Sequence, residues 1–170
     1  MTILIETERM QLRHFTLEDI NDVYTFSANE EVSRFTGDLG VVQSTADAEH
    51  VIKNIWLKEY KKYGYARYAV VCKQTQNVIG FCGFKFDEDK QQPDLGYRFM
   101  PQYWGKGYAS EAIEATIAYG KNVLGLNAAV AEVYSPNIAS RKLLSKFGFI
   151  ETKSYIEDGN EIFCLENTNL

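Results

Sequence analysis

Hydrophobic and polar residues follow strand-like and helix-like periods in turn along this chain. Apolar residues interleaved with charges over 3–14 predict a first strand. After it, Thr16 with Asp19 three residues later, an acidic first turn and apolar residues at helical spacing predict a capped helix. A second helix is predicted over 44–64, with a serine at its start and Gly64 at its end.

The pattern changes to strands in the middle of the chain. The runs "YARYAVVCK", "VIGFCGFKF" and "DLGYRFM" are rich in β-branched and aromatic residues, which predicts three successive antiparallel strands. A glycine loop then leads into a helix that ends at Gly120 or Gly125, and "AAVAEVY" predicts a buried strand. The segment "NIASRKLLSKFGF" predicts a last helix, broken at Gly148 before closing strands near 149–156 and 160–166.

Length and charge narrow the class of protein. The chain has 170 residues, so we expect a single domain over 1–170 that buries its core without disulfides or metal. The formal charge is -5 and the basic residues are scattered, so nucleic acid is not an expected partner.

Cysteine usage and the first residues point to a cytoplasmic protein. Cys72, Cys82 and Cys164 are odd in number and far apart, which favours reduced, buried thiols over a metal site. The first residues carry acids rather than the basic start of a signal peptide, and no window has the length of a membrane span. We therefore expect no membrane association.

The loop "QYWGKG" at 102–107 is the clearest candidate for chemistry. Its two glycines allow a sharp turn without a Cβ in the way, and the first amides of the next helix lack intrahelical acceptors. Such amides and the helix dipole suit a phosphate or pyrophosphate, and Lys106 adds positive charge. A nucleotide P-loop fits poorly because Gly107 replaces the Ser or Thr that reaches magnesium. The dinucleotide fingerprint fails at its third small position, Ser110, and a purely structural turn stays open.

The sequence resembles the GNAT superfamily of N-acetyltransferases over nearly its whole length. The acetyl-coenzyme A motif of that superfamily, Gln/Arg-x-x-Gly-x-Gly/Ala, is matched by Gln102, Gly105 and Gly107. The stretches "ETERMQLRHFTLED", "DLGYRFMPQYWGKGYASEA" and "NIASRKLLSKFGF" are most similar to the branch that includes ribosomal-protein N-terminal acetyltransferases. The weakest similarity lies at about 30–65, where the family forms much of the acceptor wall.

The resemblance implies a mixed α/β fold with a mostly antiparallel sheet flanked by helices. One parallel pair of strands splays apart in this family, and the pantetheine arm of acetyl-coenzyme A lies in the gap. No metal is needed. The residues implied to bind the coenzyme are Phe99, Met100, Gln102, Gly105, Lys106, Gly107, Tyr108, Ala109, Ser110 and Asn137.

The late helix supplies one candidate for catalysis. The family pattern Asn-x-x-Ser is matched by Asn137 and Ser140, one turn apart, and the resemblance places both beside pantetheine and the sulfur. Asn137 also fits a plain helix cap, and Ser140 fits helix packing. Many members carry a tyrosine acid seven residues after that asparagine, where this chain has Leu144, so Ser140 becomes the candidate that hydrogen-bonds the thiolate.

Two further residues are candidates for proton transfer, Asp94 as the group that takes a proton, directly or through water, and Tyr134 as a donor. Asp94 precedes Gly96 and Tyr97, where the family often has an acid; a solvated aspartate at the strand is the alternative. Tyr134 ends the strand before the late helix and lines the acceptor cleft or donates a proton, with simple packing as the alternative. Four arginines, at positions 13, 34, 67 and 98, form surface pairs or recognise an acidic acceptor.

The function implied is acetyl-coenzyme A-dependent N-acetyl transfer to a primary amine by direct attack in a ternary complex. The acceptor is a protein N-terminal α-amine or a small-molecule amine, and the protein is a monomer or homodimer. One alternative is a non-catalytic acyl-coenzyme A-binding module, which the Leu144 departure supports. Another is a small NAD(P)-dependent oxidoreductase, which requires a doubly wound parallel sheet.

Overall fold

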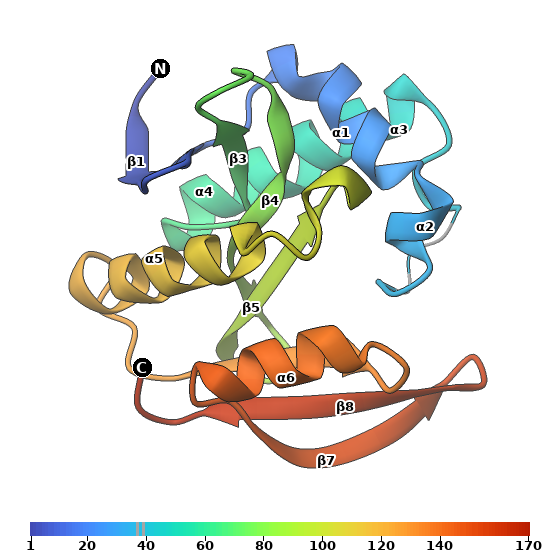
Figure 1. The fold of residues 1–170 in the computed structure, drawn as a ribbon, viewed down its shortest axis with the longest axis vertical. Coiled ribbons are helices and arrows are strands. Elements are labelled where there is room, and N and C mark those ends of the chain that lie inside the picture. Colours follow the sequence, from blue (N-terminus) through green and yellow to red (C-terminus); the bar gives the residue numbers. More distant parts are fainter. Residues whose placement is uncertain (37, 39) are drawn as a thin grey trace.

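The computed structural model describes residues 1–36, 38 and 40–170, and its centre is one eight-stranded sheet (Figure 1). The strand order is β1-β2-β3-β4-β5-β6-β8-β7, and every neighbouring pair is antiparallel except β5 and β6. The strands are β1 Ile3–Glu6, β2 Met10–Arg13, β3 Tyr68–Cys72, β4 Val78–Asp87, β5 Gln92–Phe99, β6 Ala129–Tyr134, β7 Ile150–Glu157 and β8 Asn160–Asn167.

The helices begin and end largely where the sequence predicts. Thr16 forms a capping box with Asp19, and Gly64 ends its helix with a left-handed φ of 82°. Within the predicted second helix, a central stretch is a π-helix. The helical elements are η1 Leu17–Asp19, α1 Ile20–Ser27, α2 Glu30–Ser33, α3 Thr45–His50, the π-helix η2 Val51–Trp56, α4 Leu57–Tyr63, η3 Pro101–Tyr103, α5 Tyr108–Asn122 and α6 Ile138–Lys146.

One expected element is wrong in detail. The segment 3–14 is a hairpin of β1 and β2 rather than a single strand. The chain reverses where the Thr7 amide donates to the Met10 carbonyl at 2.9 Å, without a Gly or Pro to mark the turn. Four polar residues at 6–9 interrupt the apolar pattern at this turn, but none of them is the Gly, Pro, Asn or Asp that usually marks one. The short helix α2, capped by Asn29, was also not predicted.

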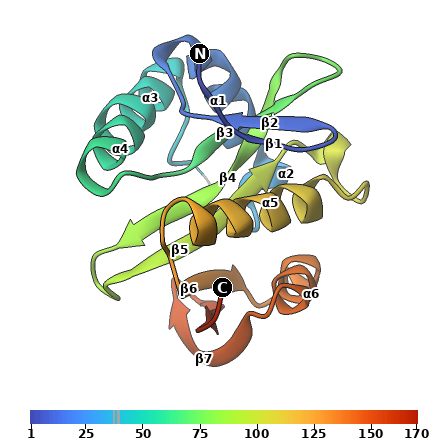
Figure 2. The same ribbon diagram turned by 90° about the vertical axis from the view of Figure 1, so that its left-hand side faces the viewer.

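Helices cover both faces of the sheet at β3, which explains why every residue of this strand is buried. Tyr68 and Val70 face the core beneath α5, whereas Ala69 and Val71 face the core beneath α1, α3 and the π-helix (Figure 2). Side chains alternate across a strand, so two covered faces produce an unbroken apolar run. The three cysteines are free and buried, as expected.

The sheet divides at its one parallel pair. Strands β5 and β6 pair at a single point, Asp94 with Val130, and then diverge along the chain direction. On its other edge β6 pairs with β8 along its whole length, from Ala129 opposite Asn167 to Tyr134 opposite Ile162. The sequence-based prediction of a mixed sheet with a splayed parallel pair is confirmed.

Candidate active site

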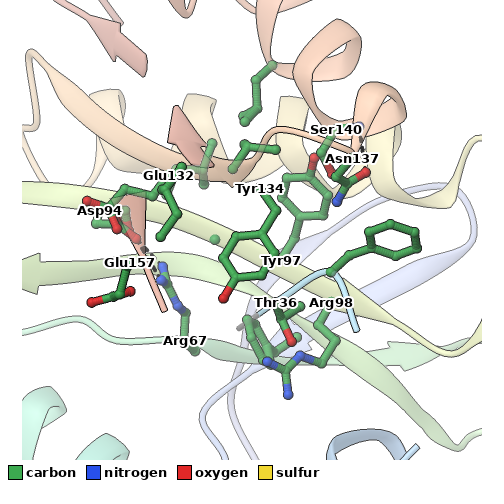
Figure 3. A pocket seen from close by; sticks show the side chains of 17 residues that line it. Thr36, Arg67, Asp94, Tyr97, Arg98, Glu132, Tyr134, Asn137, Ser140 and Glu157 are labelled. Atoms are coloured by element: carbon green, nitrogen blue, oxygen red, sulfur yellow. Dashed lines mark hydrogen bonds and ion pairs between the residues drawn. The ribbon is translucent and has the colours of Figure 1, made fainter. Parts of the chain in front are cut away.

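Two cavities meet where β5 and β6 diverge. The first, which we call the loop cavity, has a volume of about 560 Å³ and lies between the end of β5, the start of α5 and the start of α6. The second, the sheet cavity, has a volume of about 250 Å³ and lies between β5 and β6 (Figure 3). Six residues line both cavities: Phe35, Thr36, Tyr97, Arg98, Asn137 and Ser140.

Glycine backbone shapes the wall of the loop cavity. Gly105 and Gly107 have φ values of +68° and +82°, in the left-handed region that side chains disfavour. A Cβ at Gly105 would meet nothing within 4 Å, so the loop leaves open space on that side. Gly107 is the N-cap of α5, and the first helical bond of this turn runs from the Glu111 amide to the Gly107 carbonyl at 3.1 Å.

The amides of residues 105–110 donate to no acceptor in the described part of the chain. They lie at the N-terminus of a 15-residue helix, where the helix dipole places partial positive charge. Two ammonium groups lie nearby: Lys106 Nζ donates to the Gln102 carbonyl at 2.7 Å, and Lys146 Nζ reaches from α6 to Ser110 Oγ at 3.2 Å. This arrangement suits a phosphate-bearing ligand.

An arginine from the distant β1–β2 turn holds the loop in place. Arg9 Nε pairs with Glu111 Oε2 at 2.7 Å, and the Arg9 backbone amide donates to the other carboxylate oxygen at 2.9 Å. Its NH1 donates to the Lys106 carbonyl at 2.8 Å, and its guanidinium carbon lies 4.0 Å from the centre of the Tyr108 ring. Arg9 thereby joins the loop, α5 and the N-terminal hairpin.

Most of the residues expected to bind a coenzyme line the loop cavity, and three do not. Met100 donates its amide to the Ile79 carbonyl at 3.0 Å, so this amide is already engaged. Gln102 and Lys106 close the loop through their own hydrogen bond. The residues that line the cavity are Phe99, Gly105, Gly107, Tyr108, Ala109, Ser110 and Asn137.

Asn137 and Ser140 lie together at the junction of the two cavities (Figure 3). Asn137 Oδ1 accepts a hydrogen bond from the Ser140 amide at 3.2 Å, so Asn137 caps α6 and lines the site as well. Leu144, one turn further along α6, is buried and presents only carbon to the sheet cavity. The sequence therefore places a hydroxyl at the junction but no tyrosine on this helix.

Asp94 is held in an ion pair. Arg67 NH2 lies 2.7 Å from Asp94 Oδ1, and both side chains are largely buried. Arg67 NH1 also donates to the carbonyls of Gly83 at 2.6 Å and Asp94 at 2.7 Å. Because Asp94 also forms the single residue pairing between β5 and β6 in the sheet, this ion pair fixes the vertex from which the cavities open.

The remaining charges of the sheet cavity are mostly paired as well. Arg98 NH2 lies 2.6 Å from Asp38 Oδ2, and Glu132 pairs with Lys90. In the described part of the chain, the carboxylate of Glu157 forms no ion pair or hydrogen bond. Three of the four arginines considered for an acidic acceptor, Arg13, Arg67 and Arg98, are thus paired with internal carboxylates. The fourth, Arg34, lies over the Phe35 ring instead.

Two tyrosines face the sheet cavity. Burial, together with the negative charges of Glu157, Asp158 and Asp38, raises the pKa of Tyr134. Burial raises the pKa of Tyr97 to about 12, although the neighbouring Ser140 hydroxyl partly opposes this rise. Sequence reasoning named Tyr134 but passed over Tyr97, because an aromatic residue in a buried strand is usually packing.

A family model described as an acetyltransferase (GNAT) domain matches residues 9–150. The chain belongs to the GNAT acetyltransferase family. A relative from Bacillus subtilis (strain 168), named uncharacterized N-acetyltransferase YoaA, is 33% identical over 147 residues, which are 86% of this chain and 82% of that protein. The similarity agrees with the sequence-based expectation and identifies the protein as an N-acetyltransferase.

Solved GNAT structures share the fold despite low sequence identity. RimL, a ribosomal L7/L12 alpha-N-protein acetyltransferase in complex with coenzyme A, superposes with a TM-score of 0.84 at 13% identity, covering 99% of this chain and 98% of that one. Spermidine N-acetyltransferase from Vibrio cholerae, in complex with coenzyme A and spermine, superposes with a TM-score of 0.77 at 17% identity. The match covers 96% of this chain and 97% of that one.

The GNAT sheet excludes the oxidoreductase alternative on structural grounds. A doubly wound dinucleotide fold needs a mostly parallel sheet, whereas this sheet has one parallel pair among eight strands.

Among the described residues, no helix combines the length and the apolar character needed to cross a membrane.

Proposed function

We propose that this GNAT enzyme binds acetyl-coenzyme A in the loop cavity and transfers the acetyl group to a primary amine in the sheet cavity. The observation that carries the proposal is the junction of the two cavities at Tyr97, Asn137 and Ser140. A donor entering from one side and an amine entering from the other meet there. Holding two reactants in contact supplies a large part of the rate enhancement in such transfers.

The amides of residues 105–110 would hold the pyrophosphate of the coenzyme, supported by Lys106 and Lys146. The free donors, the helix dipole and the open side of Gly105 favour this role. The thioester supplies an activated acyl group, so no metal enters the proposal. Among the backbone groups expected to contact the coenzyme, the Met100 amide is the least suited to bind it, since the Ile79 carbonyl already accepts its hydrogen bond.

Direct attack by the amine agrees with the position of the thiols. None of Cys72, Cys82 and Cys164 lines either cavity, and all three are buried. In the proposed step, the amine nitrogen bonds to the acetyl carbon while the carbon–sulfur bond breaks. The electron pair leaves on sulfur, and the amine loses its extra proton to solvent or to a nearby base. Ser140 hydrogen-bonds the departing sulfur.

The charges of the sheet cavity favour a cationic acceptor. Both arginines that line it are paired, whereas Glu157 is an exposed carboxylate at the cavity. Glu157 and Asp38 also contribute negative potential around Tyr134. An ammonium is attracted to such a site before it loses its proton and reacts. Two amine classes deserve testing first, because structural neighbours are named for them: protein N-terminal α-amines and polyamines.

The test is thiol release from acetyl-coenzyme A against matched amines, with mass spectrometry of the product. The panel contains a peptide with a free N-terminus, the same peptide with a blocked N-terminus and a free lysine, spermidine, and a neutral amino sugar. A form of the peptide with both its N-terminus and its lysine blocked serves as the control. We expect acetylation of one amine class and no thiol release with this doubly blocked peptide. Tight binding of acetyl-coenzyme A with no acetylated product from any amine would instead favour the non-catalytic module.

A further inference from the structure

Tyr97 occupies the junction with a hydroxyl group that no described residue satisfies. The residue lies on β5 opposite Cys82 of β4 and lines both cavities. In Figure 3 its ring extends from β5 toward Ser140 on α6. The hydroxyl oxygen is buried and has no hydrogen-bond partner among the described residues. The Ser140 hydroxyl lies close enough to act on the pKa of Tyr97, but the two hydroxyls do not meet the geometry of a hydrogen bond.

A buried hydroxyl without a partner is destabilising, because it has lost its water without gaining a protein partner. Phenylalanine would fill the same space without that cost. Native structures contain few such groups, and a ligand that supplies the missing partner is one explanation. Tyr97 is therefore suited to a ligand atom that reaches the junction.

The other hydroxyls around the sheet cavity are engaged or directed elsewhere. Thr36 Oγ1 donates to the Ser33 carbonyl at 3.1 Å and also contacts Asp38. The Tyr134 side chain points away from Ser140, toward the side where Thr36 and Arg67 lie (Figure 3). Tyr97 and Ser140 are therefore the hydroxyl-bearing residues left where the loop cavity joins the sheet cavity.

We propose that the Tyr97 hydroxyl donates a hydrogen bond to the sulfur of the acetyl donor as the carbon–sulfur bond breaks, alongside Ser140. The inference rests on the proposed function and adds a second donor from β5 at the reacting atom. As the amine nitrogen bonds to the acetyl carbon, the electron pair of the breaking bond moves to sulfur. Tyr97 stabilises that developing charge, and the proton of the amine leaves separately.

The chemistry makes Tyr97 a hydrogen-bond donor rather than a proton donor. Its pKa of about 12 lies above the roughly 8.5 of a free thiol, so the phenol keeps its proton when a thiolate forms beside it. A hydrogen bond to a charged group is stronger than one to a neutral group. The interaction therefore strengthens as negative charge develops on sulfur, which is the condition for raising kcat.

The test compares Tyr97→Phe with a matched control, Tyr119→Phe, whose tyrosine lies in α5 and lines neither cavity. We expect Tyr97→Phe to lower kcat by roughly 10- to 100-fold, with less than a twofold change in KM for acetyl-coenzyme A. The control should retain wild-type kcat. Wild-type kcat in Tyr97→Phe would overturn the inference.

Two measurements without turnover separate this role from a structural one. Because Tyr97→Phe removes an unsatisfied buried hydroxyl, the Tm of the ligand-free variant should equal or exceed that of the wild type. The thiol of bound coenzyme A, followed by thiolate absorbance, should titrate at a higher pH in the variant than in the wild type. A lowered Tm with an unchanged thiol titration would show a structural hydroxyl and contradict the inference. If the wild type does not bind acetyl-coenzyme A, the proposed function itself fails.

Discussion

The ion pair between Asp94 and Arg67 should hold the cleft open, so Asp94→Asn should act on stability more than on proton transfer. Arg67 donates to three oxygens, the Gly83 and Asp94 carbonyls and Asp94 Oδ1, at 2.6–2.7 Å. The two side chains are only 13% and 15% exposed. A Cβ on Gly96 would lie 2.5 Å from the Arg67 guanidinium carbon, so the strand packs directly on this group.

The expected magnitude follows from what the substitution leaves behind. Removing one partner of a buried ion pair costs about 3–5 kcal/mol, because the other charge stays buried. In Asp94→Asn, the amide still offers an oxygen to Arg67, and two carbonyl acceptors remain. We therefore expect a loss of about 1.5–3 kcal/mol. For a chain of this length, that lowers Tm by about 3–12 °C.

The assay is urea unfolding of Asp94→Asn, Arg67→Met and the double variant, in parallel with steady-state kinetics. The double variant should be more stable than Asp94→Asn, since it leaves no unpaired guanidinium. The kcat of Asp94→Asn should keep the pH dependence of the wild type. Wild-type stability in Asp94→Asn, together with loss of kcat near neutral pH, would refute this reasoning and make Asp94 the general base.

The other predictions concern the loop, α6 and pH. Gly107→Glu should weaken acetyl-coenzyme A binding in calorimetry by about tenfold or more, because it adds strain and a negative charge. Gly159→Glu, at a similar φ in the β7–β8 turn, should bind normally. Ser140→Ala should lower kcat about tenfold with less than a twofold change in Kd. Lys146→Ala should weaken binding about two- to fivefold in low salt, and the difference should disappear at high salt. Burial lowers the pKa of His14, so the unfolded chain takes up a proton below about pH 6.5 that the folded chain resists. The free energy of unfolding should therefore decrease as the pH is lowered from 7 to 5, and it should decrease less steeply in His14→Gln. An equal pH dependence in the two proteins would contradict the role of His14.

Local sequence patterns were sufficient for the turns and caps of the site. Gly105 and Gly107 adopt the left-handed conformations that their place before a helix suggests, and Asn137 caps α6. Capping and glycine turns depend on residues a few positions apart, which a sequence displays directly.

The contacts that depend on distant residues were not predictable in the same way. Arg9 and Glu111 lie 102 positions apart, and Arg67 and Asp94 lie 27 apart. Lys146 reaches Ser110 only because α5 and α6 flank the same cavity. Tyr97 carried no signal of its own, since a tyrosine in a buried strand fits ordinary packing until the environment of its hydroxyl is known.

The central claim is that the free amides of residues 105–110 bind the phosphates of acetyl-coenzyme A. Calorimetric titration of the metal-free protein with acetyl-coenzyme A tests it most directly, with Gly107→Glu and Gly159→Glu titrated alongside. We predict saturable one-to-one binding by the wild type and Gly159→Glu, with strongly weakened binding by Gly107→Glu. Absence of binding by the wild type, or equal affinity in all three proteins, would contradict the claim.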